Sequence, residues 1–451
     1  MLSKEENEIM TRVGRGTPGG EMLRCYWWPV GFSELVTRKG QPTKVRLLGE
    51  DLVLFRDGAG NLGLLALHCS HRGTSLEFGR VEDAGIRCCY HGWLYDTVGK
   101  CLEQPAEPAE SSFRNRVQHP AYRAQEIGGF IFAYIGPEPV PLLPNYDLFL
   151  RQDGERHVGA GHDYCNWLQR AENSVDQTHL VALHAPEYPH MALKRPVIGW
   201  ERKPYGAKIS MHVPGVTKPK FSHWIFPSHT RHTTARIGRL PDHALRFRVP
   251  VDDTNTKTFW LRFYPYGESD KGKPLTLKTV GFENDQPGIY KRVDDGWWGI
   301  ASSDQDRVAQ ESQGPIYDRS KEHLGAVDEG VILLRAMIKE SIDATLNGKD
   351  PIWILRDAAE NQNIGFDASM QEIGPLLMPT SSNVEVVQNV CFGRDASFPR
   401  TRESRFRTNL DTRPEDAFYA AAIDFASTFM STPPLIALLT PHLNIFEQPM
   451  G

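Results

Sequence analysis

The spacing of apolar and polar residues predicts a small antiparallel β unit in the first third of the chain. Residues 45–55 and 62–67 show the strand pattern on either side of a turn at 57–61. Residues 128–134 predict a later strand of the same unit, and a short helix is expected before it, over 5–14. Paired strands of this kind are typical of a compact β domain.

From about residue 150 the pattern changes to a mixture of helices and strands. The composition of residues 166–184 suits a helix, and residues 327–346 predict a long helix that ends at Asn347-Gly348. Residues 245–249 and 259–263 alternate apolar and polar side chains, which predicts two strands. Helices segregated around an antiparallel sheet imply an α+β fold.

Prolines and these changes of pattern divide the chain into five parts. Pro137, Pro139, Pro141 and Pro144 indicate a stiff linker. The expected parts are an N-terminal helical arm (1–42), the small β domain (43–136), the linker (137–149), the larger domain (150–375) and a C-terminal extension (376–451). In the extension, residues 376–413 look loop-rich and residues 417–430 predict a terminal helix.

The bulk composition describes a mildly acidic chain with no sign of a nucleic-acid or membrane surface. Its 451 residues suffice for two domains, and its net charge is −5. It has no basic block and no apolar run near the roughly 20 residues that cross a bilayer, and its charged start predicts no signal peptide. Seven cysteines are too few for a disulfide scaffold of this size. We therefore expect a cytoplasmic protein.

Two cysteine–histidine pairs form the most specific motif of the chain. Cys69-Ser-His71 is followed, after sixteen residues, by Cys88-Cys-Tyr-His91. In this order two thiolates can hold one iron of a Rieske [2Fe–2S] cluster while two imidazoles hold the other. A structural zinc site is the rival interpretation, but such sites usually contain C-x2-C pairs. Gly73 and Gly92 favour the cluster, because glycines beside the ligands let backbone N–H groups approach its sulfurs.

Residues 166–184 carry a second candidate metal site. Asp176 and His179 are three apart and share a helical face, whereas His179 and His184, five apart, would diverge by about 140° on a regular helix. Both histidines can therefore reach one metal only near a helix end or a bulge. Two histidines and a carboxylate bind Fe(II) in non-haem oxygenases and leave positions open for O2 and substrate. Alone, H-x4-H more often marks two unrelated histidines, but the upstream cluster motif favours the metal.

Together the motifs resemble those of one enzyme family. C-x-H and C-x2-H, followed by N-W-x-Q-x2-E-N-x2-D-x2-H-x4-H, resemble the oxygenase (alpha) component of Rieske non-haem iron oxygenases. Residues 46–53 and 310–319 resemble its phthalate dioxygenase and aryl O-demethylase branch, and the similarity extends to about residue 345. The resemblance implies a Rieske [2Fe–2S] domain at 43–136 and a mononuclear-iron catalytic domain with a helix-grip (START-like) fold at 150–375.

The resemblance also suggests the third iron ligand. Family members place an aspartate in an acidic, helix-starting stretch, which here contains Asp304 and Asp306. Asp306 is the preferred ligand beside His179 and His184, with Asp304 and then Asp357 as alternatives. Either aspartate of the stretch would otherwise simply cap a helix.

A separate role is expected for Asp176. Three residues before His179, its carboxylate is placed to accept the free ring N–H of that histidine. In the family this aspartate also bridges to a cluster histidine of the neighbouring subunit, here His91 or His71. Such bridging requires a head-to-tail ring, so the resemblance implies a homotrimer or a stack of two trimers.

The resemblance implies a terminal oxygenase that uses O2 and electrons from NAD(P)H. No convincing dinucleotide-binding loop is present, so the electrons are expected from a separate flavin and iron–sulfur reductase, directly or through a ferredoxin. The expected substrate is a small carboxylated or methoxylated aromatic, and monooxygenation with demethylation is favoured. Cis-dihydroxylation of the phthalate type is the alternative. A Rieske electron carrier or a substrate-binding sensor would be a different class, against which the second metal motif argues.

Several polar residues are candidates for contacts near the iron. Glu172 and Asn173 are expected to act with Asp176 in the catalytic machinery, and Asn166 is a candidate substrate contact. For each, an ordinary polar position on a helix is an equally good interpretation. A carboxylated substrate needs a cation, for which Lys208 and Arg236 are candidates in the larger domain.

Overall fold

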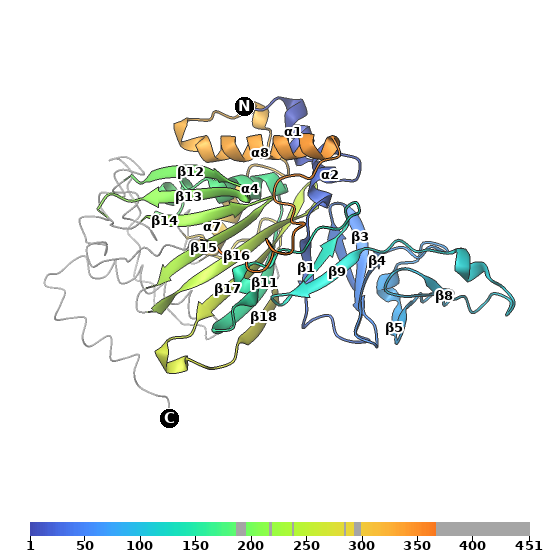
Figure 1. The fold of residues 1–451 in the computed structure, drawn as a ribbon. Coiled ribbons are helices and arrows are strands. Elements are labelled where there is room, and N and C mark those ends of the chain that lie inside the picture. Colours follow the sequence, from blue (N-terminus) through green and yellow to red (C-terminus); the bar gives the residue numbers. More distant parts are fainter. Residues whose placement is uncertain (186–194, 216–218, 237–238, 284–285, 293–298, 367–451) are drawn as a thin grey trace.

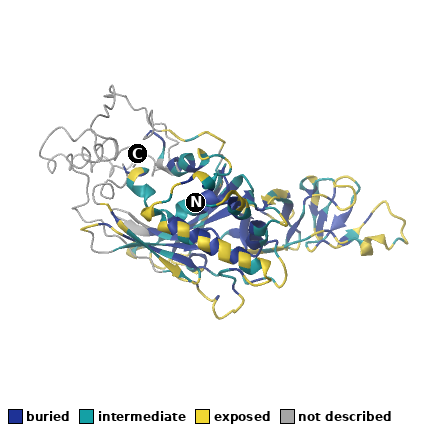
Figure 2. Ribbon diagram, turned by 90° about the horizontal axis from the view of Figure 1, so that it is seen from above, coloured by how far each residue is buried: buried dark blue, intermediate teal, exposed yellow. Residues whose placement is uncertain are grey.

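The chain folds into a large domain built on one long sheet and a smaller β unit that projects from it as an arm (Figure 1). The computed structural model describes residues 1–185, 195–215, 219–236, 239–283, 286–292 and 299–366, with the backbone alone at 234–236, 239–241 and 302–303. Buried residues fill the large domain, while the outer end of the arm is mostly exposed (Figure 2). Over the described residues, every helix is too short or too polar to cross a bilayer.

The helix predicted over 5–14 is present at the N-terminus, and a second short helix follows it. In α1 (Lys4–Thr11) the side chain of Ser3 accepts the N–H of Glu6, and the Glu6 carboxylate accepts the N–H of Ser3. The helix ends before residue 14 because Arg12 takes an extended conformation. A second helix, α2 (Pro18–Arg24), starts at a cap formed by the side chain of Thr17.

The small β unit consists of three antiparallel sheets. The first contains β1 (Trp28–Phe32), β10 (Phe130–Tyr134) and β9 (Arg123–Ile127). The second contains β2 (Thr43–Leu47), β3 (Glu50–Arg56) and β4 (Leu62–Ala66). The third contains β5 (Arg80–Glu82), β6 (Gly85–Arg87), β7 (Leu94–Tyr95) and β8 (Cys101–Glu103). The stretch 45–55 is two strands rather than one, because Leu48 and Gly49 turn the chain with φ of +50° and +78°.

The large domain confirms the α+β prediction. Its eight-stranded sheet has the order β12-β13-β14-β15-β16-β17-β11-β18, and neighbours are antiparallel except β11 and β18. The strands are β11 (Gly154–Asp163), β12 (Val197–Lys203), β13 (Gly206–His212), β14 (Lys220–Ile225), β15 (His229–Arg236), β16 (Arg239–Asp252), β17 (Asn255–Pro265) and β18 (Thr276–Phe282). The predicted strands 245–249 and 259–263 are the central parts of the hairpin β16–β17.

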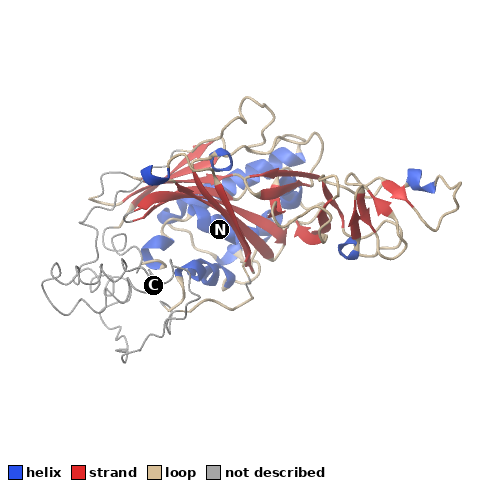
Figure 3. Ribbon diagram, turned by 90° about the horizontal axis from the view of Figure 1, so that it is seen from below, coloured by secondary structure: helices blue, strands red, loops and turns tan. Residues whose placement is uncertain are grey.

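The two faces of this sheet have different neighbours, because side chains alternate along each strand. On one face, Phe247 and Phe259 pack against Phe130 of the small unit, with ring centroids 5.9 and 6.1 Å apart. On the other face, the indole N–H of Trp200 donates to the carbonyl of Val175 in α4 (Trp167–Val175). The helices α4, α7 (Ser302–Glu311) and α8 (Glu329–Leu346) gather beside the sheet (Figures 1 and 3).

The helix predicted over 166–184 is interrupted. Asn166 caps α4, and Asp176 ends it in an extended conformation with φ −80° and ψ 107°. A short second helix, α5, follows at His179–Ala182. The long predicted helix is α8, which begins at residue 329 because residues 326–328 form a 3-10 turn. The expected loop at 376–413 and helix at 417–430 lie outside the described residues.

Candidate metal centres

Two loops of the small β unit hold the cysteine–histidine pairs in matching conformations. In the first loop the N–H of Gly73 donates to the carbonyl of Cys69 at 2.9 Å, and in the second the N–H of Gly92 donates to that of Cys88 at 3.1 Å. Both glycines have positive φ, at +74° and +73°, a conformation that side chains with a Cβ rarely adopt. The cysteines are buried, each with 3% exposure.

The two histidines of these loops lie together at the surface. The rings of His71 and His91 have centroids 4.4 Å apart, and Trp93 stacks on His71 at the same distance with an interplanar angle of 8°. Burial raises the pKa of Cys69, and the neighbouring Cys88 adds to the effect. Two adjacent buried thiols beside two surface imidazoles fit the donor set of a Rieske [2Fe–2S] cluster.

Hydrogen bonds hold the first loop in place. The hydroxyl of Tyr95 lies 3.2 Å from the sulfur of Cys69. Buried His119 joins Ser70 to the chain behind it, with Nδ1 2.7 Å from the hydroxyl and Nε2 2.8 Å from the carbonyl of Ala66. A carbonyl only accepts, so Nε2 carries the proton and the serine donates to Nδ1. Burial lowers the pKa of His119, which keeps the ring neutral.

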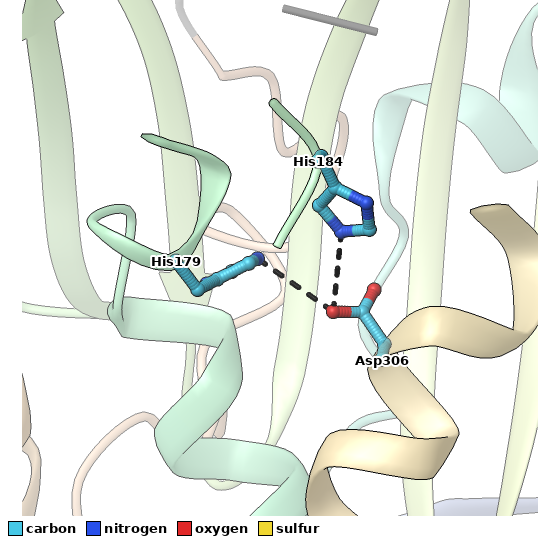
Figure 4. A group of neighbouring side chains, drawn as sticks. All are labelled: His179, His184 and Asp306. Atoms are coloured by element: carbon cyan, nitrogen blue, oxygen red, sulfur yellow. Dashed lines mark ion pairs between the residues drawn. The ribbon is translucent and has the colours of Figure 1, made fainter. Parts of the chain in front are cut away.

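In the large domain three side chains converge from separate elements (Figure 4). Oδ1 of Asp306 is 3.6 Å from Nε2 of His179 and 3.4 Å from Nε2 of His184, and the three ligand atoms lie within 4.8 Å of one another. His179 begins α5, His184 follows that helix, and Asp306 projects from α7. The interruption at Asp176 removes the divergence that one regular helix would impose on the two histidines.

Neighbouring groups fix the charge and orientation of these three side chains. Burial raises the pKa of Asp306, but the neighbouring His184, His179 and Arg170 outweigh it, so the net shift is downward. Asn173 donates to Oδ1 of Asp306 at 3.3 Å. The other ring nitrogen of His184, Nδ1, lies 2.9 Å from the amide oxygen of Gln305. Because that oxygen only accepts, Nδ1 carries the proton and Nε2 keeps a lone pair for a metal.

The arrangement fits a divalent metal ion. Ligand atoms held at about 2.1 Å from one ion and at right angles lie roughly 3 Å apart. The spacings of 3.4 and 3.6 Å from Asp306 to the histidines are close to that value. Two imidazoles and one carboxylate are the ligands of non-haem Fe(II) centres with open positions. Within the described part of the chain this is the one group of three such residues.

Comparison with known proteins identifies the family. A family model of the Rieske [2Fe-2S] domain matches residues 26–120. The oxygenase subunit of 5,5'-dehydrodivanillate O-demethylase from Sphingobium sp. strain SYK-6 is 36% identical over 81% of this chain and 86% of its own length. The chain belongs to the Rieske non-haem iron oxygenases. It is an oxygenase (alpha) component, and residues 26–120 are its Rieske domain.

Further relatives of this Rieske oxygenase agree with the assignment. Phenoxybenzoate dioxygenase subunit alpha from Ectopseudomonas oleovorans is 34% identical over 76% of the chain and 87% of its own length. Among solved structures, a variant of NdmA from Pseudomonas putida CBB5 with theobromine shares the fold with a TM-score of 0.58. It is 22% identical and covers 72% of this chain and 93% of its own.

The alternative iron ligands have other partners in this oxygenase. Asp304 accepts the N–H of Lys291 at 2.6 Å and lies 3.5 Å from the guanidinium of Arg307. Asp357 is exposed and accepts the N–H of Ala359. Neither belongs to the group formed by the two histidines and Asp306.

Of the other predicted residues on α4, Asn173 donates a hydrogen bond to Asp306, whereas Glu172 and Asn166 bond to other parts of the domain. Glu172 accepts hydrogen bonds from Arg319 at 2.8 Å and from Arg335 at 2.7 Å. Asn166 is fully buried, caps the helix and donates to two backbone carbonyls, at residues 11 and 253. Asp176 lies 3.7 Å from Nδ1 of His179, on the ring's other side from the ligand atom.

Lys208, the first predicted substrate cation, lies on the face of the sheet opposite the helices that carry His179 and Asp306. Lys208 belongs to a row of cross-strand partners with His223, Arg231 and Leu245, on the face of the sheet opposite the helices. Its ammonium lies 4.0 Å from the ring centroid of Phe221. Strand register therefore places Lys208 on the face away from the helices that carry His179 and Asp306. Arg236 ends β15, and its side chain lies outside the described residues.

Sequence reasoning missed two other arginines in this Rieske oxygenase. Arg246 in β16 and Arg262 in β17 alternate with apolar residues that face the small β unit, so they point to the helix-covered side. The signal was present in residues 245–249 and 259–263, where apolar odd positions alternate with arginine or tryptophan. Charged residues on the covered side of a central strand need a functional or structural partner.

Proposed function

We propose that this chain is the terminal oxygenase component that oxidises a carboxylated or methoxylated aromatic with O2, by monooxygenation that removes a methyl group. The observation that carries the proposal is the convergence of His179, His184 and Asp306 within 4.8 Å. The relatives with dehydrodivanillate O-demethylase and phenoxybenzoate dioxygenase names support an aromatic substrate. They also support NAD(P)H as electron source through a separate reductase, directly or through a ferredoxin, because both are named as subunits.

The proposed cofactors are a Rieske cluster on Cys69, His71, Cys88 and His91, and one Fe(II) on the three converging residues. When bound, the cluster supplies single electrons and the iron supplies the centre at which O2 is reduced. The chain's own residues keep that centre ready. Gln305 holds the proton of His184 on Nδ1, and Asn173 restrains the Asp306 carboxylate.

Cis-dihydroxylation is the second candidate, which the dioxygenase relative favours. The same ligands suit both reactions, because the outcome depends on which substrate atom lies nearest the oxidant. We propose a cytoplasmic location, supported by the six cysteines of the described residues, all of which are unpaired.

Iron content tests the metal assignment. We expect three irons per chain in the wild type, two of them in the cluster. Asp306→Ala should leave about two irons, an unchanged cluster absorption spectrum and no turnover, because a facial triad lacking its carboxylate holds iron weakly. Asp304→Asn is the matched control and should retain three irons. A third iron kept by Asp306→Ala would reject this ligand.

Product analysis tests the reaction. The enzyme would be supplied with a reductase, NADH, O2 and a panel of aromatic carboxylates and aryl methyl ethers. Loss of a methylene with release of formaldehyde is expected. A product that gains two oxygens and two hydrogens would instead establish the dihydroxylating alternative.

A further inference from the structure

Helices α4 and α7 are tied together by two side-chain links, one at a predicted iron ligand and one a helical turn away. Asn173 of α4 donates to Oδ1 of Asp306 at 3.3 Å, and Nη1 of Arg170 donates to the amide oxygen of Gln310. Arg170 comes three residues before Asn173 along α4, so the two share a helical face. Gln310 likewise follows Asp306 by four residues along α7. The Arg170–Gln310 link therefore lies about one turn, or roughly 6 Å of helix axis, from the ligand.

Arg170 is buried in the domain, and its charge has one direct partner there. Its side chain is 6% exposed, and its Nε lies 3.2 Å from Oδ2 of Asp163. Burial lowers the pKa of Arg170, but Asp163 and smaller effects from other groups outweigh it, so the net shift is upward and the guanidinium stays protonated. Among the described residues Asp163 is the one carboxylate at ion-pair distance from it.

Asp163 serves a second buried arginine as well. Its Oδ2 also accepts the hydroxyl of Thr258 at 2.5 Å, and that hydroxyl accepts Nη1 of Arg248 at 2.8 Å. Arg248 is 4% exposed. One carboxylate is thus shared between two buried arginines, although a buried charge is normally matched by a partner of its own. Asp163 therefore compensates the charge of Arg170 only in part.

The remaining charge of Arg170 acts on the predicted iron ligands. Burial raises the pKa of Asp306, and Arg170 is among the groups that outweigh burial and lower it. Electrostatic interactions in a protein interior are stronger than in water, because the effective dielectric constant is lower. A positive charge near a metal ion favours the ion of lower charge, since Fe(II) is repelled less than Fe(III).

We propose that Arg170 is a positioning residue that keeps the mononuclear iron of this oxygenase in its ferrous form. The inference rests on the proposed function, because it needs an iron on His179, His184 and Asp306. Arg170 acts in two ways. It ties α7 to α4 one turn from the ligand, and its partly compensated charge makes the one-electron reduction of Fe(III) to Fe(II) more favourable. Fe(II) is the form that such a centre presents to O2.

A redox titration of the holoenzyme tests this assignment. Electron paramagnetic resonance reports high-spin Fe(III) and the reduced cluster as separate signals, so both potentials are followed in one sample. At the wild-type midpoint of the mononuclear iron, Arg170→Gln should contain about tenfold more Fe(III) than Fe(II), which is a potential about 59 mV lower. Arg170→Lys keeps the charge, and its Fe(III) to Fe(II) ratio should stay within a factor of about three of the wild type.

Asp163→Asn is the second variant, because charge and structural damage predict opposite results for it. It breaks the same buried network as Arg170→Gln but removes the carboxylate that compensates the guanidinium. The potential should therefore rise, so that Fe(II) exceeds Fe(III) at the wild-type midpoint. A merely structural role would shift the potential in the same direction in both variants. Arg202→Gln, which removes a surface partner of Glu340, is the matched control and should leave the potential unchanged.

The assignment is overturned if Arg170→Gln keeps three irons per chain and the wild-type potential, or if its potential rises. It is also overturned if Arg170→Lys falls as far as Arg170→Gln, or if the potential of Asp163→Asn falls or stays the same. Where Arg170→Gln does not retain the third iron, the direction of the shift in Asp163→Asn decides.

Iron content separates this inference from the proposed function. A wild type with three irons per chain and a potential that these substitutions do not move would keep the oxygenase proposal and reject the role of Arg170. A wild type with two irons per chain and no O2-dependent product would reject the oxygenase proposal itself.

Discussion

At the scale of single residues, one hydroxyl in the Rieske domain is placed to tune the cluster. The Tyr95 hydroxyl lies 3.2 Å from the Cys69 sulfur, in a buried setting. When the sulfur is a thiolate ligand, only the tyrosine can donate. Reduction adds negative charge to the cluster and its sulfurs, so this hydrogen bond stabilises the reduced form more than the oxidised form.

Tyr95→Phe should therefore lower the reduction potential. If the bond favours the reduced form by about 1 kcal/mol, the loss is on the order of 40 mV for a one-electron couple. Redox titration followed by electron paramagnetic resonance measures it. Tyr122→Phe is the control, since that hydroxyl bonds to Glu50 and should leave the potential unchanged. An unchanged potential in Tyr95→Phe would exclude the tuning role.

At the scale of elements, a buried ionic network holds α4, the helix that leads to the predicted iron ligands, in place. Glu172 of α4 binds Arg335 of α8 and Arg319 of the segment between α7 and α8. Both arginines are almost fully buried, with side-chain exposures of 0% and 7%. Removing one partner of such a group leaves buried charges without compensation, which costs far more than breaking a surface pair.

Glu172→Gln should destabilise the domain by about 3 kcal/mol at neutral pH. Burial raises the pKa of Glu172, but Arg319 and Arg335 outweigh it and the net shift is downward from 4.5. A lowered pKa means that the stabilisation is complete above about pH 4.5 and is lost as the pH falls through the lower folded-state value.

Thermal unfolding across a pH series checks this prediction. The difference between wild type and Glu172→Gln should be constant from pH 5 to 8 and shrink at lower pH. Glu340→Gln, which removes a surface partner of Arg202, should have little effect at any pH. A difference that grows on acidification would contradict the expected sign.

At the scale of the whole molecule, electrons would have to pass from the cluster loops on the arm to the predicted iron ligands in the large domain. The arm with the cluster loops extends away from the helices that hold His179 (Figures 1 and 2). Asp176, beside His179, has a side chain that is 29% exposed, so another chain can reach it. A ring in which the arm of one chain meets Asp176 of the next would connect the two centres.

We therefore predict a homotrimer, or two stacked trimers, of the 50.9 kDa chain. Asp176→Asn should keep three irons per chain yet prevent electrons from passing from a reduced cluster to the iron. Single-turnover experiments with stopped-flow absorbance, beside light scattering for the mass, measure both. Asp270→Asn, at an exposed site, is the control. A monomer with full activity would rule out the ring.

The sequence by itself determined the loops and strands that form within short stretches of chain. Each cluster loop closes within five residues of its cysteine, so the motif and its glycines specify the geometry almost unaided. The strands at 245–249 and 259–263 were likewise predictable, because the period of two residues reports burial on one face.

Tertiary structure alone decided which residues from distant segments of the chain lie side by side. Asp306 is more than a hundred residues from His184, and only the packing of α7 beside α4 selects it over Asp304. Strand register placed Lys208 on the face opposite the helices and Arg246 on the helix-covered face. The alternation of apolar and polar residues shows that a strand has two different faces. Which face lies toward the predicted iron ligands depends on how the helices pack over the finished sheet.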